Sequence, residues 1–287
     1  MSRPRVSILT PSFNQAEWLT DNLRSVATQT YPNVEHVIMD GGSTDGSVEL
    51  LESAGDGVVW RSESDGGQAE AINKAFEAST GDIIGWINAD DAYVDAGVLA
   101  DVVSFFERNA KVDVAYGHCL QTTADGLVIQ VLWAPPFDVR LLSTVDFISQ
   151  PTAFIRRRVL EAPMLDETFH FALDYDLWLG LAHRGTTFAR MPRIVAIDRH
   201  QPARKSLTML DVHEADSQRL AKTYGAALPG QNDRARSRFY LRQRLFGAMW
   251  IPRIPTELAF DAPPNPLAGL WRRQLFSRKT AWPEGYR

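Results

Sequence analysis

Strand-like and helix-like segments alternate through the first 110 residues, and this alternation constrains the fold more than any other feature. Short apolar runs, typical of buried strands, are separated by segments with apolar residues at helical spacing. The connections are short, which indicates a mostly parallel sheet covered by helices on both faces. The predicted strands are residues 6–9, 34–39, 58–60 and 83–87, and the predicted helices are residues 15–29, 46–53 and 68–78.

The pattern changes after residue 110. Further strands are predicted at residues 112–116, 127–133, 147–156 and 186–198, with a helix at residues 173–183. From residue 207 the chain is predicted to be helical, with breaks at residues 228–230 and 252–266. We therefore expect an α/β domain over residues 1–206, with halves at residues 1–110 and 111–206, and a helical C-terminal extension over residues 207–287.

Composition excludes several classes of protein. With 287 residues, of which 45% are hydrophobic, the chain can bury a large core. Its single cysteine, Cys119, excludes an internal disulfide and a cysteine-based zinc site. The apolar run near the N-terminus is too short for a secretory signal, and no apolar segment reaches the roughly 18 to 20 residues that span a bilayer. We expect a cytoplasmic protein.

Positive charge is concentrated near the C-terminus. Residues 234–287 contain eleven Lys or Arg but only three acidic residues, whereas the whole chain carries a net charge of −5. The acidic remainder does not suggest nucleic-acid binding. Arginines interleaved with apolar residues over residues 234–250 indicate a basic amphipathic helix. Three partners stay open for this helix: the inner surface of a membrane, its own domain, or a second subunit in a homodimer.

Polar residues follow every strand predicted in the first half. In open α/β sheets, ligands bind outside the carboxyl ends of the strands. Here those ends are followed by polar and acidic segments, which we expect to meet at one edge of the sheet: residues 10–14, 40–44, 62–66 and 88–91.

Two adjacent carboxylates, Asp90 and Asp91, directly follow the fourth predicted strand. Such a pair is costly at a strand end unless a positive charge neutralises it. A divalent cation with oxygen ligands would do so, and Mg²⁺ or Mn²⁺ would also bind a substrate phosphate. The alternative is an ordinary turn in which Asp91 or Asp95 caps the next helix.

Asp40, at the end of the second strand, is placed to accept a hydrogen bond from a ribose or a base. Dinucleotide-binding enzymes have an acidic residue there too, but they need a glycine-rich loop after the first strand. The loop at residues 10–14 contains no glycine, which disfavours that class. The alternative for residues 40–45 is a simple helix-entry turn.

Three further residues are candidates for chemistry. Asp174 and Asp176 lie in the first turn of a predicted helix, where a carboxylate can act as general base towards a hydroxyl group. Acidic residues in a first turn also simply stabilise the helix dipole. His200 follows a predicted strand and suits a metal or a phosphate, or a purely structural role.

These pieces occur in the order found in glycosyltransferase family 2, the inverting nucleotide-sugar transferases with the GT-A fold. The resemblance covers about residues 5–206. Its blocks are Val6-Ser7-Ile8-Leu9-Thr10-Pro11-Ser12-Phe13-Asn14, Gln29 to Asn33 with Asp40 to Ser47, Asp65-Gly66-Gly67-Gln68 with Ala71 to Lys74, Asn88-Ala89-Asp90-Asp91, Gln150-Pro151-Thr152, Asp174 to Leu179, and Arg199-His200.

The resemblance implies a role for each matching residue. The nucleotide pocket would be lined by Thr10, Pro11, Phe13 and Asn14. Asp40 would contact the base of the nucleotide, and Asp65, Asn73 and Lys74 would lie near its ribose and phosphates. Asp91 would bind Mg²⁺ or Mn²⁺, supported by Asp90, and His200 is the second candidate ligand. Asp174 would be the catalytic base, and Asp176 is the alternative candidate for this role. The family often has a second aspartate where this chain has Gly41.

The resemblance implies an enzyme that moves a sugar from a nucleoside-diphosphate sugar to a hydroxyl of a glycan or lipid-linked acceptor, in polysaccharide or glycolipid assembly. Two alternatives stay open. A sugar-phosphate nucleotidyltransferase also needs paired carboxylates, although it usually has a glycine-rich basic loop after the first strand. A non-catalytic carbohydrate-binding relative would keep the fold without the reaction.

Overall fold

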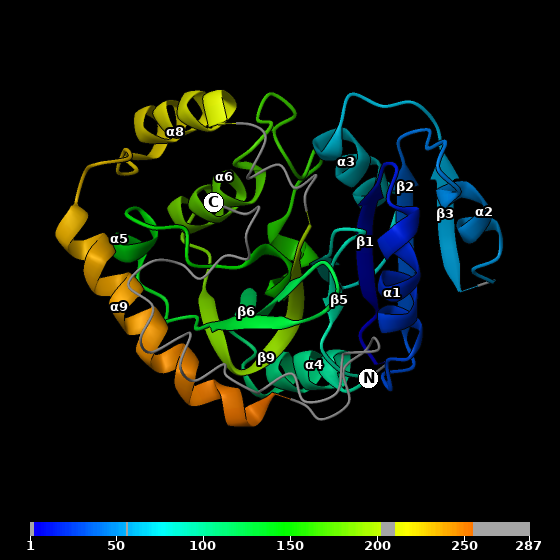
Figure 1. The fold of residues 1–287 in the computed structure, drawn as a ribbon, viewed down its shortest axis with the longest axis horizontal. Helices are drawn as coiled ribbons and strands as arrows, with labels where there is room; N and C mark the ends of the chain where they lie inside the picture. Colours follow the sequence, from blue (N-terminus) through cyan, green and yellow to red (C-terminus); the bar gives the residue numbers. More distant parts are fainter. Residues whose placement is uncertain (1–2, 56, 202–209, 255–287) are drawn as a thin grey trace.

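The computed structural model describes residues 3–55, 57–201 and 210–254. The part of the predicted extension beyond residue 254 therefore lies outside the described residues. The described chain forms one mixed sheet with helices on both faces, and the longest helix runs along the outer margin of the molecule (Figure 1).

The sheet has nine strands and is mostly parallel, as the alternation predicts. Its strand order is β3-β2-β1-β4-β8-β6-β9-β5, and β7 pairs with β6. The pairs among β3, β2, β1 and β4, and the pair of β6 and β9, are parallel, whereas β8, β7 and β5 pair antiparallel with their neighbours. The strands are β1 (Val6–Ser12), β2 (Val34–Asp40), β3 (Val58–Ser62), β4 (Ile83–Trp86), β5 (Ala92–Tyr93), β6 (Val114–Thr123), β7 (Val128–Leu132), β8 (Phe154–Arg156) and β9 (Phe188–His200).

Helices connect these strands and follow them. The α-helices are α1 (Ala16–Ala27), α2 (Ser47–Glu52), α3 (Gln68–Ala78), α4 (Val98–Arg108), α5 (Val139–Leu142), α6 (Leu173–His183), α8 (Leu210–Tyr224) and α9 (Asp233–Trp250). Three short 3₁₀ turns are η1 (Gln150–Thr152), η2 (Arg157–Val159) and η3 (Ile251–Arg253). None of the helices in the described part of the chain is long and apolar enough to cross a membrane.

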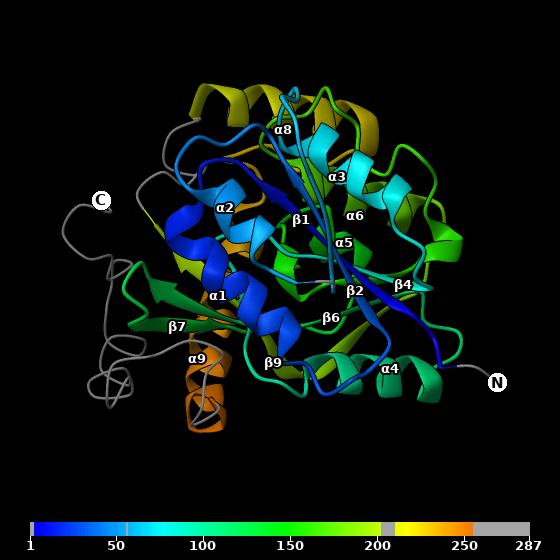
Figure 2. The same cartoon turned by 90° about the vertical axis from the view of Figure 1, so that its right-hand side faces the viewer.

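Alternating residues of the central strands pack on opposite faces of the sheet. Leu9 of β1 belongs to a core that contains the buried sides of α3 and α6. Its neighbour Ile8 belongs to a second core that contains α4 and the end of α9. Because side chains alternate along a strand, a near-continuous apolar run such as β1 needs both layers of helices. Figure 2 shows α3, α6 and α8 together on one side of the sheet.

The four strands and three helices predicted in the first half are confirmed, with shifts of a few residues at their ends. The predicted strand at residues 147–156 is wrong over most of its length, because only Phe154–Arg156 is extended and η1 precedes it. Pro151 has no N–H to donate to a sheet, which explains why the strand begins only after it, at Phe154. Strand β9 continues to His200, so Arg199 and His200 lie inside it rather than after it.

Candidate functional site

The carboxylate of Asp40 shapes the loop at the end of β2. The side chain is only 1% exposed, and its Oδ2 accepts hydrogen bonds from the N–H groups of Gly42 (3.1 Å) and Ser43 (2.8 Å). The Oγ of Ser62 also donates to it at 2.7 Å, which ties β3 to the same loop. Asp40 therefore acts within the protein, and the loop that it holds forms the surface at this strand end.

The loops after β1 and β2 form one unit. The backbone N–H of Asn14 donates to Oγ of Ser43 (2.7 Å), and Oδ1 of Asn14 accepts from the N–H of Thr44 (2.9 Å). Asn14 adopts a left-handed conformation with φ of 51°, which asparagine tolerates better than most residues. Oδ2 of Asp45 accepts from the N–H of Ala16 at 2.9 Å. The first turn of α1 is thus capped by the second loop.

Phe13, Gly41 and Asp65 meet at this edge of the sheet. A Cβ added to Gly41 would lie 3.2 Å from Cδ2 of Phe13 and 3.3 Å from both carboxylate oxygens of Asp65. The ring of Phe13 is 60% exposed, so its face is available to a ligand. Burial raises the pKa of Asp65 above its usual value. The structure thus brings together two residues predicted to bind the donor, and the glycine leaves room for the Asp65 carboxylate.

Thr10, by contrast, faces the protein interior. It is fully buried, and its Oγ1 lies 2.9 Å from Nε2 of His36. Burial lowers the pKa of His36 to about 3, so the imidazole stays neutral at physiological pH. Pro11, the next residue, is partly exposed. Thr10 therefore holds the start of the loop through its contact with His36 in the protein interior.

Asn73 and Lys74 also make contacts within the protein. Nδ2 of Asn73 donates to the carbonyl of Leu165 (2.9 Å), and its Oδ1 accepts from the N–H of the same residue (2.8 Å). Nζ of Lys74 lies 2.8 Å from Glu70 and 3.0 Å from Glu63, and these contacts raise its pKa to about 12. Asn73 thus ties α3 to the segment that precedes α6.

The turn with Asp90 and Asp91 is joined to the end of β9. Asp91 is 4% exposed, and its Oδ1 accepts from the backbone N–H of Arg199 at 3.1 Å. Oδ2 of Asp90 accepts from Nε2 of Gln201 at 3.2 Å. The buried amide of Asn22 donates to the carbonyl of Asp91 at 3.2 Å from the α1 side. The two carboxylates are therefore held between the central strand and the far half of the sheet.

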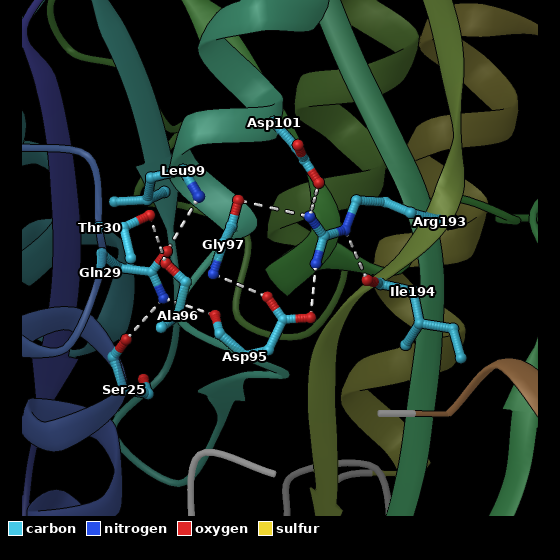
Figure 3. Close-up of polar contacts among 10 residues, drawn as sticks. All are labelled: Ser25, Gln29, Thr30, Asp95, Ala96, Gly97, Leu99, Asp101, Arg193 and Ile194. Carbon is cyan, nitrogen blue, oxygen red and sulfur yellow. Dashed lines mark hydrogen bonds and ion pairs between the residues drawn. The ribbon is translucent and has the colours of Figure 1, made fainter. Parts of the chain in front are cut away.

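The helix that follows Asp91, α4, has Gly97 at its N-cap and no side-chain capping hydrogen bond. Figure 3 shows the contacts that Asp95 makes instead. Oδ1 of Asp95 accepts from the N–H of Gly97 (2.8 Å), while its Oδ2 lies 2.8 Å from a guanidinium nitrogen of Arg193. The N–H of Leu99, in the first turn of α4, donates to Oε1 of Gln29 at 2.9 Å. The alternative of a simple capping turn is thus wrong for Asp91.

Asn88 links three elements around the same turn. Its Oδ1 accepts from Nε2 of Gln68 (2.8 Å) and Nε1 of Trp86 (3.0 Å), and its Nδ2 donates to Oε1 of Gln150 (3.0 Å). Gln150 in turn donates to the carbonyl of Trp86. These hydrogen bonds therefore connect the start of α3, the end of β4 and η1 to the acidic turn.

His200 is buried near a second carboxylate. Its Nε2 lies 3.6 Å from Oδ2 of Asp198, which accepts a hydrogen bond from Gln121 at 2.8 Å. Over the described ranges, no three His, Cys, Asp or Glu side chains group closely enough to hold a metal ion by themselves. The buried carboxylate of Asp91 and the partly exposed one of Asp90 fit a hard divalent cation that completes its shell with phosphate oxygens and water.

Asp174 and Asp176 face different neighbours. Residues two apart on a helix point about 200° apart around its axis. The carboxylate of Asp176 accepts a hydrogen bond from the hydroxyl of Tyr224 on α8, and burial raises the pKa of Asp176. Asp174 instead interacts with Asp146, whose pKa it raises. The structure therefore separates the two candidate bases.

Asp146 was not predicted from the sequence. The residue is exposed to solvent, yet burial of the carboxyl group and then the charge of Asp174 raise its pKa well above the usual value. The sequence signal was weak, because Asp146 lies between apolar residues before the Gln150 block. Asp146 joins Asp174 as a candidate functional residue.

Helix α8 holds the segment that leads into α6. Oδ2 of Asp216, which is buried, accepts hydrogen bonds from the N–H groups of His170 (3.3 Å), Phe171 (2.8 Å) and Ala172 (3.1 Å). A carboxylate that accepts several backbone N–H groups at a helix start also suits the helix dipole. Asp216 therefore fixes the turn that carries Asp174.

Comparisons with known proteins agree with this architecture. The family model described as glycosyl transferase family 2 matches residues 7–171. A "PGL/p-HBAD biosynthesis glycosyltransferase" of Mycobacterium bovis is 29% identical over 161 residues, which cover 55% of this chain and 61% of the relative. An uncharacterized glycosyltransferase of Mycobacterium tuberculosis is 33% identical over 118 residues, 40% of this chain and 45% of that one. The chain thus matches less than two thirds of either relative's length.

Solved structures show the same fold at low sequence identity. Mannosyltransferase PcManGT from Pyrobaculum calidifontis, in complex with GDP-Man and Mn²⁺, has a TM-score of 0.62 at 18% identity, covering 90% of this chain and 77% of that one. S. aureus TarS 1–349, in complex with UDP-GlcNAc, has a TM-score of 0.60 at 16% identity, covering 94% and 79%.

Proposed function

Because the chain belongs to glycosyltransferase family 2 and has the GT-A fold, we propose that it transfers a sugar from a nucleoside-diphosphate sugar to a hydroxyl group of an acceptor. The observation that carries this proposal is the buried acidic turn at the end of β4. Asp91 is held there by the backbone of Arg199, and Asp90 by Gln201, without serving as a helix cap. Such a turn suits a cation that binds a diphosphate.

The donor is proposed to bind along the ends of β1, β2 and β3. The exposed ring of Phe13 and the carboxylate of Asp65 flank Gly41 and suit the base and the ribose. Asp40 and Asn14 would act by holding the loop that receives them. Solved neighbours bound to UDP-GlcNAc and to GDP-Man support a nucleotide-sugar donor.

A divalent cation, Mg²⁺ or Mn²⁺, is proposed to bind at Asp91, with Asp90 beside it and His200 as a further ligand. When bound, the cation supplies Lewis-acid stabilisation of the charge that develops on the leaving diphosphate. The protein's part is to hold the two carboxylates in place, through Arg199, Gln201 and Asn22. The Mn²⁺ complex of one structural neighbour supports this assignment.

Asp174 is proposed as the general base of a single displacement with inversion. The acceptor hydroxyl loses its proton to the Asp174 carboxylate as its oxygen bonds to the anomeric carbon. The bond from that carbon to the diphosphate oxygen breaks on the opposite face. Asp146 is the carboxyl group that interacts with Asp174, and burial and the charge of Asp174 raise the pKa of Asp146. Asp176 is less suited, because it is bonded to Tyr224.

The acceptor is proposed to be a glycan or a lipid-linked molecule, in polysaccharide or glycolipid assembly. A relative named as a PGL/p-HBAD biosynthesis glycosyltransferase supports a biosynthetic role, although it is matched over only part of its length. The surface at Asp146 and Asp174 would receive the acceptor hydroxyl. Two carboxyl groups there favour a neutral or cationic acceptor over an anionic one.

Product analysis tests the proposal directly. The protein is incubated with a panel of nucleotide sugars and Mn²⁺, and the released nucleotide is identified. Release of a nucleoside diphosphate is expected, whereas pyrophosphate release would identify a nucleotidyltransferase. No release from any donor, even by slow hydrolysis, would favour a non-catalytic relative. Thermal shifts measured with different nucleoside diphosphates identify the nucleotide base of the donor, since a ligand at 100 times its Kd adds about 2.7 kcal/mol of stability.

A further inference from the structure

The outer face of α9 combines exposed arginines with exposed apolar side chains. Leu241, Leu245 and Met249 have 57%, 49% and 62% of their surface exposed. At 3.6 residues per turn, they share an arc of roughly 100° with three exposed arginines. We call this set the outer face of α9: Arg234, Arg238, Leu241, Arg242, Leu245 and Met249.

The opposite side of α9 packs against its own domain. Phe239 is 4% exposed, and Gly247 is buried. The rings of Phe246 and Trp250 pack against the sheet side: Phe246 lies 4.7 Å from the ring of Trp133, and Trp250 lies 4.1 Å from the ring of His118. The helix is therefore anchored along β7, and it runs along the margin of the molecule (Figure 1). Packing on its own domain thus accounts for one side of the basic helix only.

Positive charge dominates this part of the chain. Residues 234–253 contain six arginines and no aspartate or glutamate, whereas the chain as a whole is acidic. Among the described residues, the guanidinium groups of Arg234, Arg238 and Arg242 form no ion pair. Arg234 and Arg238 also line a hollow together with Asp233 and Ser237. The outer face thus presents positive charge that the described part of the chain leaves without an ion pair.

We propose that the outer face of α9 binds the surface of a membrane that contains anionic lipid. Leu241, Leu245 and Met249 would enter the boundary between headgroups and acyl chains, where an interfacial helix buries its apolar side. The three arginines would bind lipid phosphates, and each basic residue near an anionic surface adds to affinity. Repulsion of the acidic body would orient the molecule with α9 towards the lipid.

A second copy of the chain is the less suitable occupant. In a twofold dimer the same patch lies on both subunits. Arg234, Arg238 and Arg242 of one copy would then face their equivalents, and no described acidic residue of the outer face would neutralise them. An anionic lipid surface complements the charge and also accepts the apolar side chains.

Vesicle co-sedimentation of the full chain tests the proposal. The probes are vesicles of phosphatidylcholine alone and of phosphatidylcholine with 30 to 40% phosphatidylglycerol, at roughly 50 and 500 mM salt. We expect binding to the anionic vesicles at low salt and little binding to the neutral ones. The combined variant Arg234→Gln, Arg238→Gln, Arg242→Gln should bind anionic vesicles on the order of 100-fold more weakly. A matched control replaces three exposed basic residues of the body: Arg61→Gln, Lys111→Gln and Arg140→Gln.

Circular dichroism shows whether each variant is folded, and donor hydrolysis without lipid measures the proposed function separately. A loss of vesicle binding can therefore be told apart from a failure of the proposed function. Equal weakening in the control variant, or full binding by the α9 variant, would overturn the proposal. A dimer in light scattering that the variant Leu241→Ser, Leu245→Ser, Met249→Ser dissociates would assign the outer face to a second copy instead.

Discussion

The backbone N–H of Arg199 donates to Oδ1 of Asp91 at 3.1 Å, although 108 residues separate the two in sequence. This hydrogen bond links the end of the central strand β4 to the end of β9, in the other half of the sheet. The guanidinium of Arg199 continues the link to Asp21 on α1 (2.6 Å) and lies over the ring of Trp18. The acidic turn is thus held from both halves of the domain, which fixes the position of Asp91.

Replacing Asp91 by Asn should abolish metal-dependent transfer while the protein stays folded. The amide keeps the size and an acceptor for Arg199 but lacks the charge that a divalent cation requires. We expect kcat to fall on the order of 100-fold or more, with thermal unfolding within a few degrees of wild type. Asp101→Asn, at an exposed partner of Arg193, is the control. Unchanged activity of the Asp91 variant in the presence of EDTA would refute the metal assignment.

Asp174→Asn should lose turnover and keep donor binding, because the general base acts on the acceptor. The expected loss in kcat is about 10²–10⁴-fold, measured with saturating donor, while the Kd of the nucleoside diphosphate stays constant. Asp176→Asn is the matched comparison two positions away on the other side of α6, and its kcat should stay within about tenfold of wild type. The opposite pattern would transfer the role of base to Asp176.

Asp216→Ala should destabilise the protein, since three backbone N–H groups lose their acceptor. Hydrogen bonds to charged groups typically contribute about 1.5–3 kcal/mol, so a loss of about 2–3 kcal/mol in the free energy of unfolding is expected. Turnover should also fall, because this segment leads directly to Asp174. Denaturation by urea measures the first effect. Glu214→Ala, an exposed position on the same helix, should leave both quantities unchanged.

Asp146→Asn should make stability less sensitive to alkaline pH. The folded protein raises the pKa of Asp146, so it favours the protonated carboxyl. That contribution is fully present below the ordinary pKa of 3.8 and is lost as pH rises through the raised value. The variant should therefore match wild type near pH 4 and become the more stable of the two towards pH 8. A difference in the free energy of unfolding that is constant from pH 4 to 8 would contradict the assignment. The same pH dependence of that difference in the control variant Glu77→Gln would contradict it too.

Gly41→Asp should weaken donor binding. Its Cβ would lie 3.3 Å from both oxygens of Asp65 and 3.2 Å from the ring of Phe13, and its carboxylate would add a like charge beside Asp65. We expect about tenfold weaker binding of the nucleoside diphosphate by calorimetry. Gly57→Ala, where no atom lies near the added Cβ, is the control. Equal affinity of Gly41→Asp and wild type would show that Gly41 lies away from the donor.

The sequence by itself determined the local elements and one edge of the site. Period-2 and period-3.6 patterns report which residues are buried, so the strands around Ile8 and Ile84 and the helix around Ile72 could be predicted. Asp90 and Asp91 were recognised because polar residues after a buried strand must lie at a sheet edge. Asn22, a polar residue in the apolar stripe of α1 between Leu19 and Val26, carried a signal that was missed.

Only the tertiary structure decided which carboxylates act together. Asp174 and Asp176 are equivalent by local pattern, and they differ because Asp146 and Tyr224 approach α6 from different sides. Asp216 reaches the start of α6 from more than 40 residues downstream, and Arg199 reaches Asp91 across the sheet. Such contacts depend on how distant segments pack, whereas periodicity records only the burial of each segment. Within the described ranges, the same packing covers only one side of α9, which its basic pattern alone did not show.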